Sequence, residues 1–105
     1  MRQARVLNHG RFAGVLSEPA DGGFRFVYAP DYLASDAGPI SLTLPKRTEA
    51  FVAPTLFPFF FGLLAEGSTR EIQHRMLRID EDDHMGLLLA TAADAVGSVS
   101  IEPMP

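Results

Sequence analysis

Residues 4–28, ARVLNHGRFAGVLSEPADGGFRFVY, hold two turn signals that separate three stretches of strand-forming residues. The first signal, NHG at residues 8–10, lies between residues 4–7 and residues 12–16. Asn and Gly tolerate the positive φ angles that tight hairpins need, so these two stretches are expected to pair. The sequence therefore predicts an N-terminal β-hairpin.

A third strand is expected after the second turn signal, DGG at residues 21–23. In the stretch FRFVY at residues 24–28, aromatic side chains alternate with Arg25 and Val27. This period of two residues is typical of a strand with one buried face. Three antiparallel strands in a row are therefore predicted, and they set the fold class.

The segment that follows is expected to leave the sheet and then return to it. Two prolines interrupt residues 29–39, APDYLASDAGP, which have room for a single helical turn. Residues 40–44, ISLTL, alternate apolar with hydroxyl side chains, which predicts a short strand that Pro45 ends. Residues 46–54 are expected to form an exposed loop.

Residues 55–64, TLFPFFFGLL, predict a helix in which Thr55 is the N-cap and Pro58 lies in the first turn. At helical spacing its apolar residues form two faces. One face consists of Phe57, Phe60, Phe61 and Leu64, and the other consists of Leu56, Phe59 and Leu63. A helix that is apolar all round must be covered all round. Either the sheet and two sister helices bury it completely, or one face contacts a partner.

Two further helices and a last strand complete the chain. Gly67 is expected to end the first helix, and Ser68 with Glu71 forms a capping box that begins the second. The expected buried face of this second helix consists of Ile72, Met76 and Ile79.

The acidic residues 80–83 precede a third helix, where the helix dipole favours them. Its apolar stripe consists of Met85, Leu88, Leu89 and Ala92. Residues 98–101 alternate as a final strand.

These segments predict an α+β fold, as a single domain over residues 1–105, with an antiparallel sheet of about five strands packed with about three helices. The chain is 47% hydrophobic and 21% charged, a composition that favours folding over disorder. No apolar run approaches the roughly 18 to 20 residues that span a bilayer, so no membrane anchor is expected.

Composition and motifs also argue against most classes of chemistry. The net charge is −4 and the nine Lys and Arg residues are scattered, so direct nucleic-acid binding is not expected. The absence of cysteine excludes thiolate sites. The acids at residues 80–83 lack the alternate spacing of ion-binding loops, and His9, His74 and His84 lie far apart in sequence. Neither a phosphate-binding glycine loop nor a nucleophile elbow occurs, so we expect a protein without catalytic activity, cofactor or metal.

Partner binding is expected on the second apolar face of the predicted 55–64 helix and on the turn that follows it. The expected partner-binding residues are Phe59, Leu63, Ala65, Glu66, Gly67, Ser68, Thr69 and Arg70. A homodimer through the same face is an alternative occupant. The residues therefore favour an interaction protein over an enzyme.

Five motifs, in their order along the chain, are similar to those of a known bacterial family. The motifs are NHGRFAGVL, FRFVYAPDYLAS, PISLTLP, FFFGLLAEGSTRE and ADAVGSVSI, and the similarity extends from about Ala4 to Pro103. In sequence and spacing they resemble the N-terminal subdomain of the HipA family of serine/threonine kinase toxins. The resemblance implies the fold of that subdomain and a place in a bacterial, cytoplasmic toxin–antitoxin system.

The resemblance also implies partners. In split systems of this family, a small HipS protein corresponds to this subdomain, HipT is the kinase and HipB is a DNA-binding protein. This implies an antitoxin-type protein that binds and inhibits a HipT-like kinase, and that meets a HipB-like protein directly or through the kinase. The alternative is a structural N-terminal lobe that a HipA-like kinase needs for assembly and HipB contact, without an inhibitory role.

Overall fold

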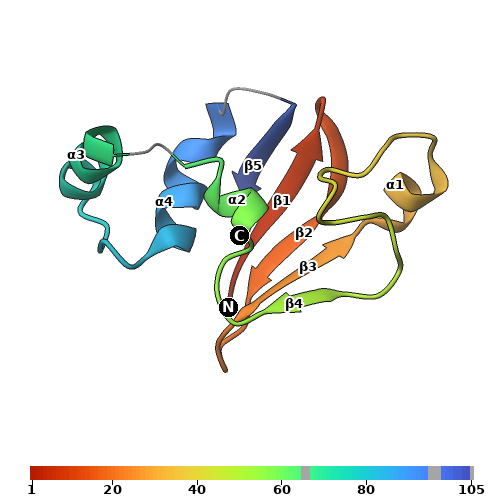
Figure 1. The fold of residues 1–105 in the computed structure, drawn as a ribbon, viewed down its shortest axis with the longest axis horizontal. Helices are drawn as coiled ribbons and strands as arrows, with labels where there is room; N and C mark the ends of the chain where they lie inside the picture. The colour runs from red at the N-terminus through yellow and green to blue at the C-terminus, as the bar shows by residue number, and fades with distance from the viewer. Residues whose placement is uncertain (65–66, 95–97, 105) are drawn as a thin grey trace.

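A five-stranded antiparallel sheet organises the part of the chain that the computed structural model describes, residues 1–64, 67–94 and 98–104 (Figure 1). The strands, in their order across the sheet, are β4 (Phe51–Ala53), β3 (Phe24–Tyr28), β2 (Arg11–Glu18), β1 (Arg2–Asn8) and β5 (Val99–Pro103). All neighbouring strands run antiparallel. The predicted meander of three N-terminal strands is confirmed.

The first hairpin turns at His9 and Gly10, whose φ angles are 52° and 78°. Two consecutive positive φ angles match the twist of a two-residue hairpin. The turn therefore lies where NHG predicted it, although His9 and not Asn8 adopts the left-handed conformation. The register shifts between Val6 and Leu7 of β1, whose partners are Gly14 and Phe12, so Ala13 is the extra residue of a bulge in β2.

Residues 40–44 do not form the strand that their alternation predicted. Ser41 and Leu44 make only an isolated bridge to each other, and Leu42 is 95% exposed. The Tyr28 hydroxyl satisfies one backbone group at each end of this segment. It accepts a hydrogen bond from the Ile40 N–H at 3.1 Å and donates one to the Leu44 carbonyl oxygen. The segment is therefore a tight bend held at both ends by one buried phenol.

The fourth strand of the sheet lies instead within the segment expected to be a loop. In β4, Phe51 pairs with Phe26 of β3, and its ring lies 6.4 Å from the Phe26 ring. Phe51 is buried and Val52 is 76% exposed, so the strand has one buried face. Three residues are too few for a periodic pattern to be detected from sequence.

Four α-helices and one 3-10 turn occur in the described chain. They are α1 (Pro30–Ala34), α2 (Pro58–Phe61), α3 (Gly67–Leu77), α4 (His84–Thr91) and the 3-10 turn Ala92–Asp94. The three helices expected after residue 54 correspond to α2, α3 and α4, and α1 is the single turn expected within residues 29–39. The α+β fold class is thus confirmed. None of the described helices is long and apolar enough to cross a membrane.

Helix α2 is shorter than predicted. Pro58 is its first residue, as a first-turn proline should be, but Phe57 and not Thr55 stands at the N-cap. The N–H groups of Leu63 and Leu64 bond three residues back, so the chain has already left the α-helix there. Helical spacing therefore fails beyond Phe61. Leu56, which precedes the helix, is buried, whereas Phe61, its last residue, is 36% exposed.

The core lies between one face of the sheet and the helices α2 and α4. Its fully buried members include Val6, Leu16, Phe26 and Ile101 from the strands and Phe60, Met85, Leu87 and Leu88 from the helices. The predicted stripe of α4 is confirmed for Met85, Leu88 and Ala92, while Leu87 was missed and Leu89 is only half-buried.

An ion-pair cluster joins the start of α4 to the sheet. Asp83 is the N-cap of α4 and accepts a hydrogen bond from the Gly86 N–H at 3.0 Å, as expected for an acidic cap. The Arg2 guanidinium donates to both Asp83 carboxylate oxygens at 2.7 and 3.0 Å, and also to Glu18 at 2.7 Å. Arg2 therefore ties β1, β2 and α4 together.

This cluster predicts a pH-dependent contribution to stability. Hydrogen bonds from Arg2 lower the pKa of the Asp83 carboxyl below its ordinary value of 3.8. A carboxyl whose pKa is lower in the folded state stabilises the fold above its unfolded pKa, and this contribution is lost as pH falls through the folded pKa. Asp83→Asn keeps a capping side chain but removes the charge. Because the Asp83 side chain is 33% exposed and screened by solvent, we expect a loss of about 1 kcal/mol near pH 7.

Urea unfolding of Asp83→Asn and of the parent protein at about pH 7 and about pH 2 measures this effect. The difference between the two proteins should shrink at the lower pH, because protonation of Asp83 as pH falls through its lowered pKa removes the charge that Arg2 contacts. An equal difference at both pH values would show that shape rather than charge is responsible.

Candidate partner-binding surface

Helix α3 lies at one end of the long axis of the molecule, beyond α4 and away from the sheet (Figure 1). Helix α1 lies at the other end, near β2 and β3 (Figure 1). Among the described residues the core holds none from α3, and Ile79, just after the helix, packs against the core only in part. The helix therefore has an outward side that the described domain leaves uncovered.

The apolar side chains of α3 point outward, so the predicted buried face is wrong for two of its three residues. Ile72 is 46% exposed and Met76 is 77% exposed, and the neighbouring Leu77 is 47% exposed. His74 is the buried residue among the side chains of this helix that the structure describes, and its Nδ1 lies 3.1 Å from the Ile79 carbonyl oxygen. Periodicity identifies a face but does not say whether the domain itself or a partner covers it.

We call Ile72, Met76 and Leu77 the α3 surface. A single exposed apolar residue is ordinary, but three within two turns of one helix form a patch typical of an interaction site. Basic residues border it, because Arg70 and Arg75 lie in α3 and Arg78 directly follows it, with Glu71 as the acid in the helix. Acidic residues lie there too, because Glu71, Glu81 and Asp82 line one pocket together with Arg70.

Phe61 connects the base of α3 to the rest of the domain. Its ring packs edge-on against the His84 ring at 4.9 Å, and the Arg70 guanidinium lies 5.0 Å from the Phe61 ring centroid. Such cation–π contacts stabilise by about 0.5–1 kcal/mol at exposed sites. One aromatic side chain thus joins α2, α3 and α4.

The sequence-predicted binding residues fall into two groups. Phe59 and Leu63 are half-buried and pack partly against the core, with the Phe59 ring 5.2 Å from the Phe60 ring. Gly67 begins α3 with a φ of 60°, Thr69 is exposed and Arg70 is half-buried. Ala65, Glu66 and the side chain of Ser68 lie outside the described part of the structure. Their role in binding stays a prediction.

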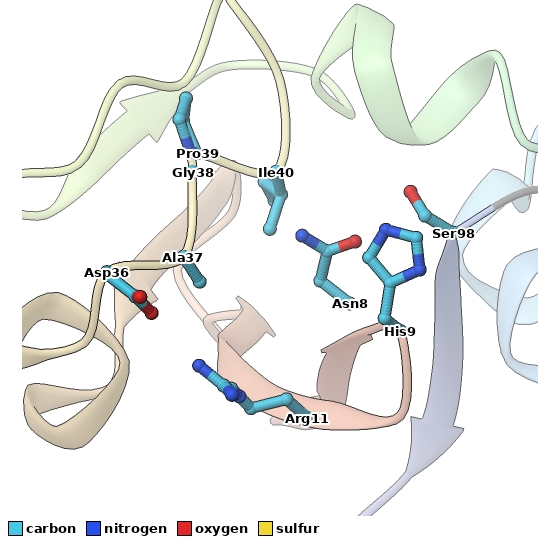
Figure 2. A pocket seen from close by; sticks show the side chains of 9 residues that line it. All are labelled: Asn8, His9, Arg11, Asp36, Ala37, Gly38, Pro39, Ile40 and Ser98. Atoms are coloured by element: carbon cyan, nitrogen blue, oxygen red, sulfur yellow. The ribbon is translucent and has the colours of Figure 1, made fainter.

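A pocket of 490 Å³ lies between the first hairpin and the loop after α1 (Figure 2). Figure 2 shows the Asn8 amide, the His9 ring and the Ser98 hydroxyl on one side and residues 36–39 on the other. Asn8 donates to the Tyr32 hydroxyl at 2.9 Å, whereas its buried Oδ1 has no hydrogen-bond partner within the described residues. This pocket was not predicted from the sequence, because the residues that line it come from three segments far apart in the chain, residues 8–11, residues 36–40 and Ser98.

The pocket does not assemble an evident catalytic group. Within the described structure, no hydrogen bond joins the Ser98 hydroxyl to the His9 ring, so the pair lacks the contact that activates a nucleophile. No three His, Asp or Glu side chains among the described residues are arranged to hold a metal ion.

Comparison with known proteins gives one family. Residues 4–102 match the family described as HipA N-terminal domain. A solved structure titled N-terminal domain of HipA toxin is 33% identical in sequence and superposes with a TM-score of 0.77. The similarity covers 100% of this chain and 94% of that chain.

Two curated proteins are similar over nearly the whole chain. An uncharacterized protein of Haemophilus influenzae is 36% identical over 102 residues, which cover 97% of this chain and 92% of that protein. The putative kinase Y4mE of Sinorhizobium fredii is 33% identical over 103 residues, which cover 94% of this chain but only 24% of that protein. The chain thus spans almost all of one relative and about a quarter of the other.

Proposed function

Because this chain belongs to the HipA N-terminal domain family, we propose that it binds a HipA-like serine/threonine kinase in the bacterial cytoplasm and holds that kinase inactive. In this role it is the antitoxin of a toxin–antitoxin module, the part that HipS has in split systems. A HipB-like DNA-binding protein is the third partner, reached directly or through the kinase. The protein itself is not an enzyme.

The observation that carries the proposal is the exposure of the α3 surface. Full burial of one Leu, Ile or Met side chain stabilises by roughly 1.5–3 kcal/mol. Three such side chains that the domain leaves exposed can therefore contribute binding free energy when a partner covers them. A kinase that covers these side chains gains that contribution on binding. Phe59, Leu63 and residues 65–66 precede α3 along the chain, residues 67–70 begin it, and all are proposed to extend the contact.

The two relatives support two arrangements of the same domain. The Haemophilus protein is little longer than this domain, which supports a separate chain that binds its kinase in trans. In Y4mE the domain is one quarter of a chain named a putative kinase, which supports the second candidate, a structural lobe that completes a kinase without inhibiting it. Both candidates use a kinase-facing surface, and they differ in what binding does to activity.

Mixing the purified protein with the kinase encoded beside its gene tests the proposal. We expect a complex by size-exclusion chromatography and a fall in kinase autophosphorylation as the protein is added. Unchanged or increased activity within a stable complex would support the structural lobe instead. If no complex forms, both candidates fail.

A substitution in α3 tests the surface itself. Met76→Glu introduces a charge where 77% of the side chain is exposed, so folding should change by less than about 0.5 kcal/mol. We expect affinity for the kinase to fall about tenfold or more, because a buried unpaired carboxylate opposes the contact. Leu42→Glu is the matched control, since Leu42 is 95% exposed and lies in a bend outside α3. If Met76→Glu and Leu42→Glu bind the kinase with equal affinity, the kinase does not contact the α3 surface.

A further inference from the structure

The sheet has a second face whose side chains the described core does not include. Antiparallel pairing aligns Glu102, Arg5, Val15 and Val27 across β5, β1, β2 and β3. The next row on this face contains Gln3 of β1, Ser17 of β2, Arg25 of β3 and Val52 of β4, and Ser17 is buried. We call this side the open face, defined by Arg5, Phe12, Val15, Arg25, Val27 and Val52.

Side chains of the open face remain accessible, although residues one position away in the same strands are fully buried. Val52 is 76% exposed and Phe12 is 37% exposed, and Val15 and Val27 are half-buried without joining the core. Strands with one solvated face normally carry polar residues there. Four apolar residues on this face are therefore more than solvent exposure alone explains.

Two depressions give the open face a shape that side chains can fill. One, of 430 Å³, has Val15, Arg25 and Val27 in its wall, and the other, of 480 Å³, is lined by Val27 with Pro30 and Leu33 of α1. They lie side by side because both contain Val27. A ligand with apolar side chains spaced along one direction can enter both.

The charges of the open face are positive. Arg5 and Arg25 are exposed, and the Arg5 guanidinium stacks over the Phe12 ring at 5.0 Å. In the described structure both ion pairs belong to Arg2, so neither Arg5 nor Arg25 is neutralised by a carboxylate contact. Glu102, at the edge strand, is the acid of these rows. The face is thus a cationic and apolar region on a chain of net charge −4.

This charge pattern argues against a second copy as the occupant. A symmetric dimer would bring the same patch of both protomers together, so the arginines of one would face those of the other. Like charges in contact disfavour such an interface. The occupant that complements the face has apolar side chains with carboxylates beside them.

We propose that the open face docks an amphipathic helix of a partner protein whose apolar stripe is flanked by Asp and Glu. A helix suits the site because helices are the usual cover of an antiparallel sheet in α+β domains, as α4 already is on the other face. Its apolar side chains enter the two depressions, and its carboxylates pair with Arg5 and Arg25. This proposal uses no residue of the α3 surface and does not depend on kinase binding.

The test uses the full chain, labelled with ¹⁵N, and two synthetic helical peptides. Both peptides carry a leucine stripe, flanked by Glu in one and by Lys in the other. We expect the Glu peptide to shift the amide signals of Val15, Val27 and Val52, and the Lys peptide to leave them unchanged. Arg5→Glu/Arg25→Glu should weaken binding of the Glu peptide about tenfold or more. Arg75→Glu/Arg78→Glu, a matched change at α3, should not alter it.

Equal binding of the two peptides, or shifts confined to α3, would overturn the proposal. So would concentration-dependent dimerisation that Arg5→Ala/Arg25→Ala strengthens, because removing the like charges would then favour a contact between copies through this face. The two proposals can fail independently of each other. Met76→Glu tests the kinase contact at α3 and should leave the affinity for the Glu peptide unchanged, because Met76 is not part of the open face.

Discussion

A Gly14→Ala variant is expected to lose about 3 kcal/mol of unfolding free energy, a large part of the roughly 5–15 kcal/mol that holds a domain folded. Gly14 lies in β2 opposite Tyr28 of β3. A methyl group there would overlap the Val27 carbonyl oxygen and stand 2.8 Å from the Phe26 ring. Backbone of the next strand cannot move aside as a flexible side chain can, so the clash must separate β2 from β3.

Thermal unfolding followed by circular dichroism measures this loss. A penalty of about 3 kcal/mol corresponds to a fall in Tm of more than about 10 °C for a domain of this size. Gly38→Ala is the control, because its added methyl group meets no atom within 4 Å and its φ angle is not in the left-handed range. Equal Tm values for the two variants would contradict the packing of β2 on β3.

The parts of the fold that sequence predicted are those determined by neighbouring residues. The turns at residues 8–10 and 21–23 contain glycines with positive φ, and the conformation is a property of the residue itself. The acidic cap of α4 is similarly local, because Asp83 bonds a backbone N–H three residues ahead. Hence the predictions of the hairpins and of the start of α4 are confirmed.

The errors arise where a distant residue decides the structure. Residues 40–44 have the pattern of a strand, but the Tyr28 hydroxyl satisfies the backbone groups at both of their ends. Sequence pattern alone does not reveal that contact, nor the pairing of Phe51 with Phe26 that makes β4. Similarly, Ile72 and Met76 were correctly placed on one face of α3 but assigned to the wrong environment. The expected partner-binding residues lie before α3 or in its first turn, and their role stays a prediction, whereas the exposure of Ile72 and Met76 was not expected.

Phe60→Ala is expected to destabilise the protein by about 3–5 kcal/mol, the cost of removing a buried phenylalanine from a packed core. Phe60 is 0% exposed, and its ring lies 5.6 Å from the Phe26 ring of β3 and 6.1 Å from the Phe57 ring. Truncation leaves a cavity between α2 and the sheet, and the aromatic neighbours lose their edge-to-face contacts. The short helix α2 has only one turn, so it has few other contacts to hold it in place.

The adjacent residue provides a control of the same type. Phe61→Ala removes the same atoms from a side chain that is 36% exposed and touches mainly His84 and Arg70, so we expect a loss of about 1 kcal/mol. Urea unfolding of both variants gives the two values. A difference of about 2 kcal/mol or more supports a helix with one buried face, with Phe61 at its exposed edge. Similar losses would mean that α2 is buried all round, as its composition alone permits.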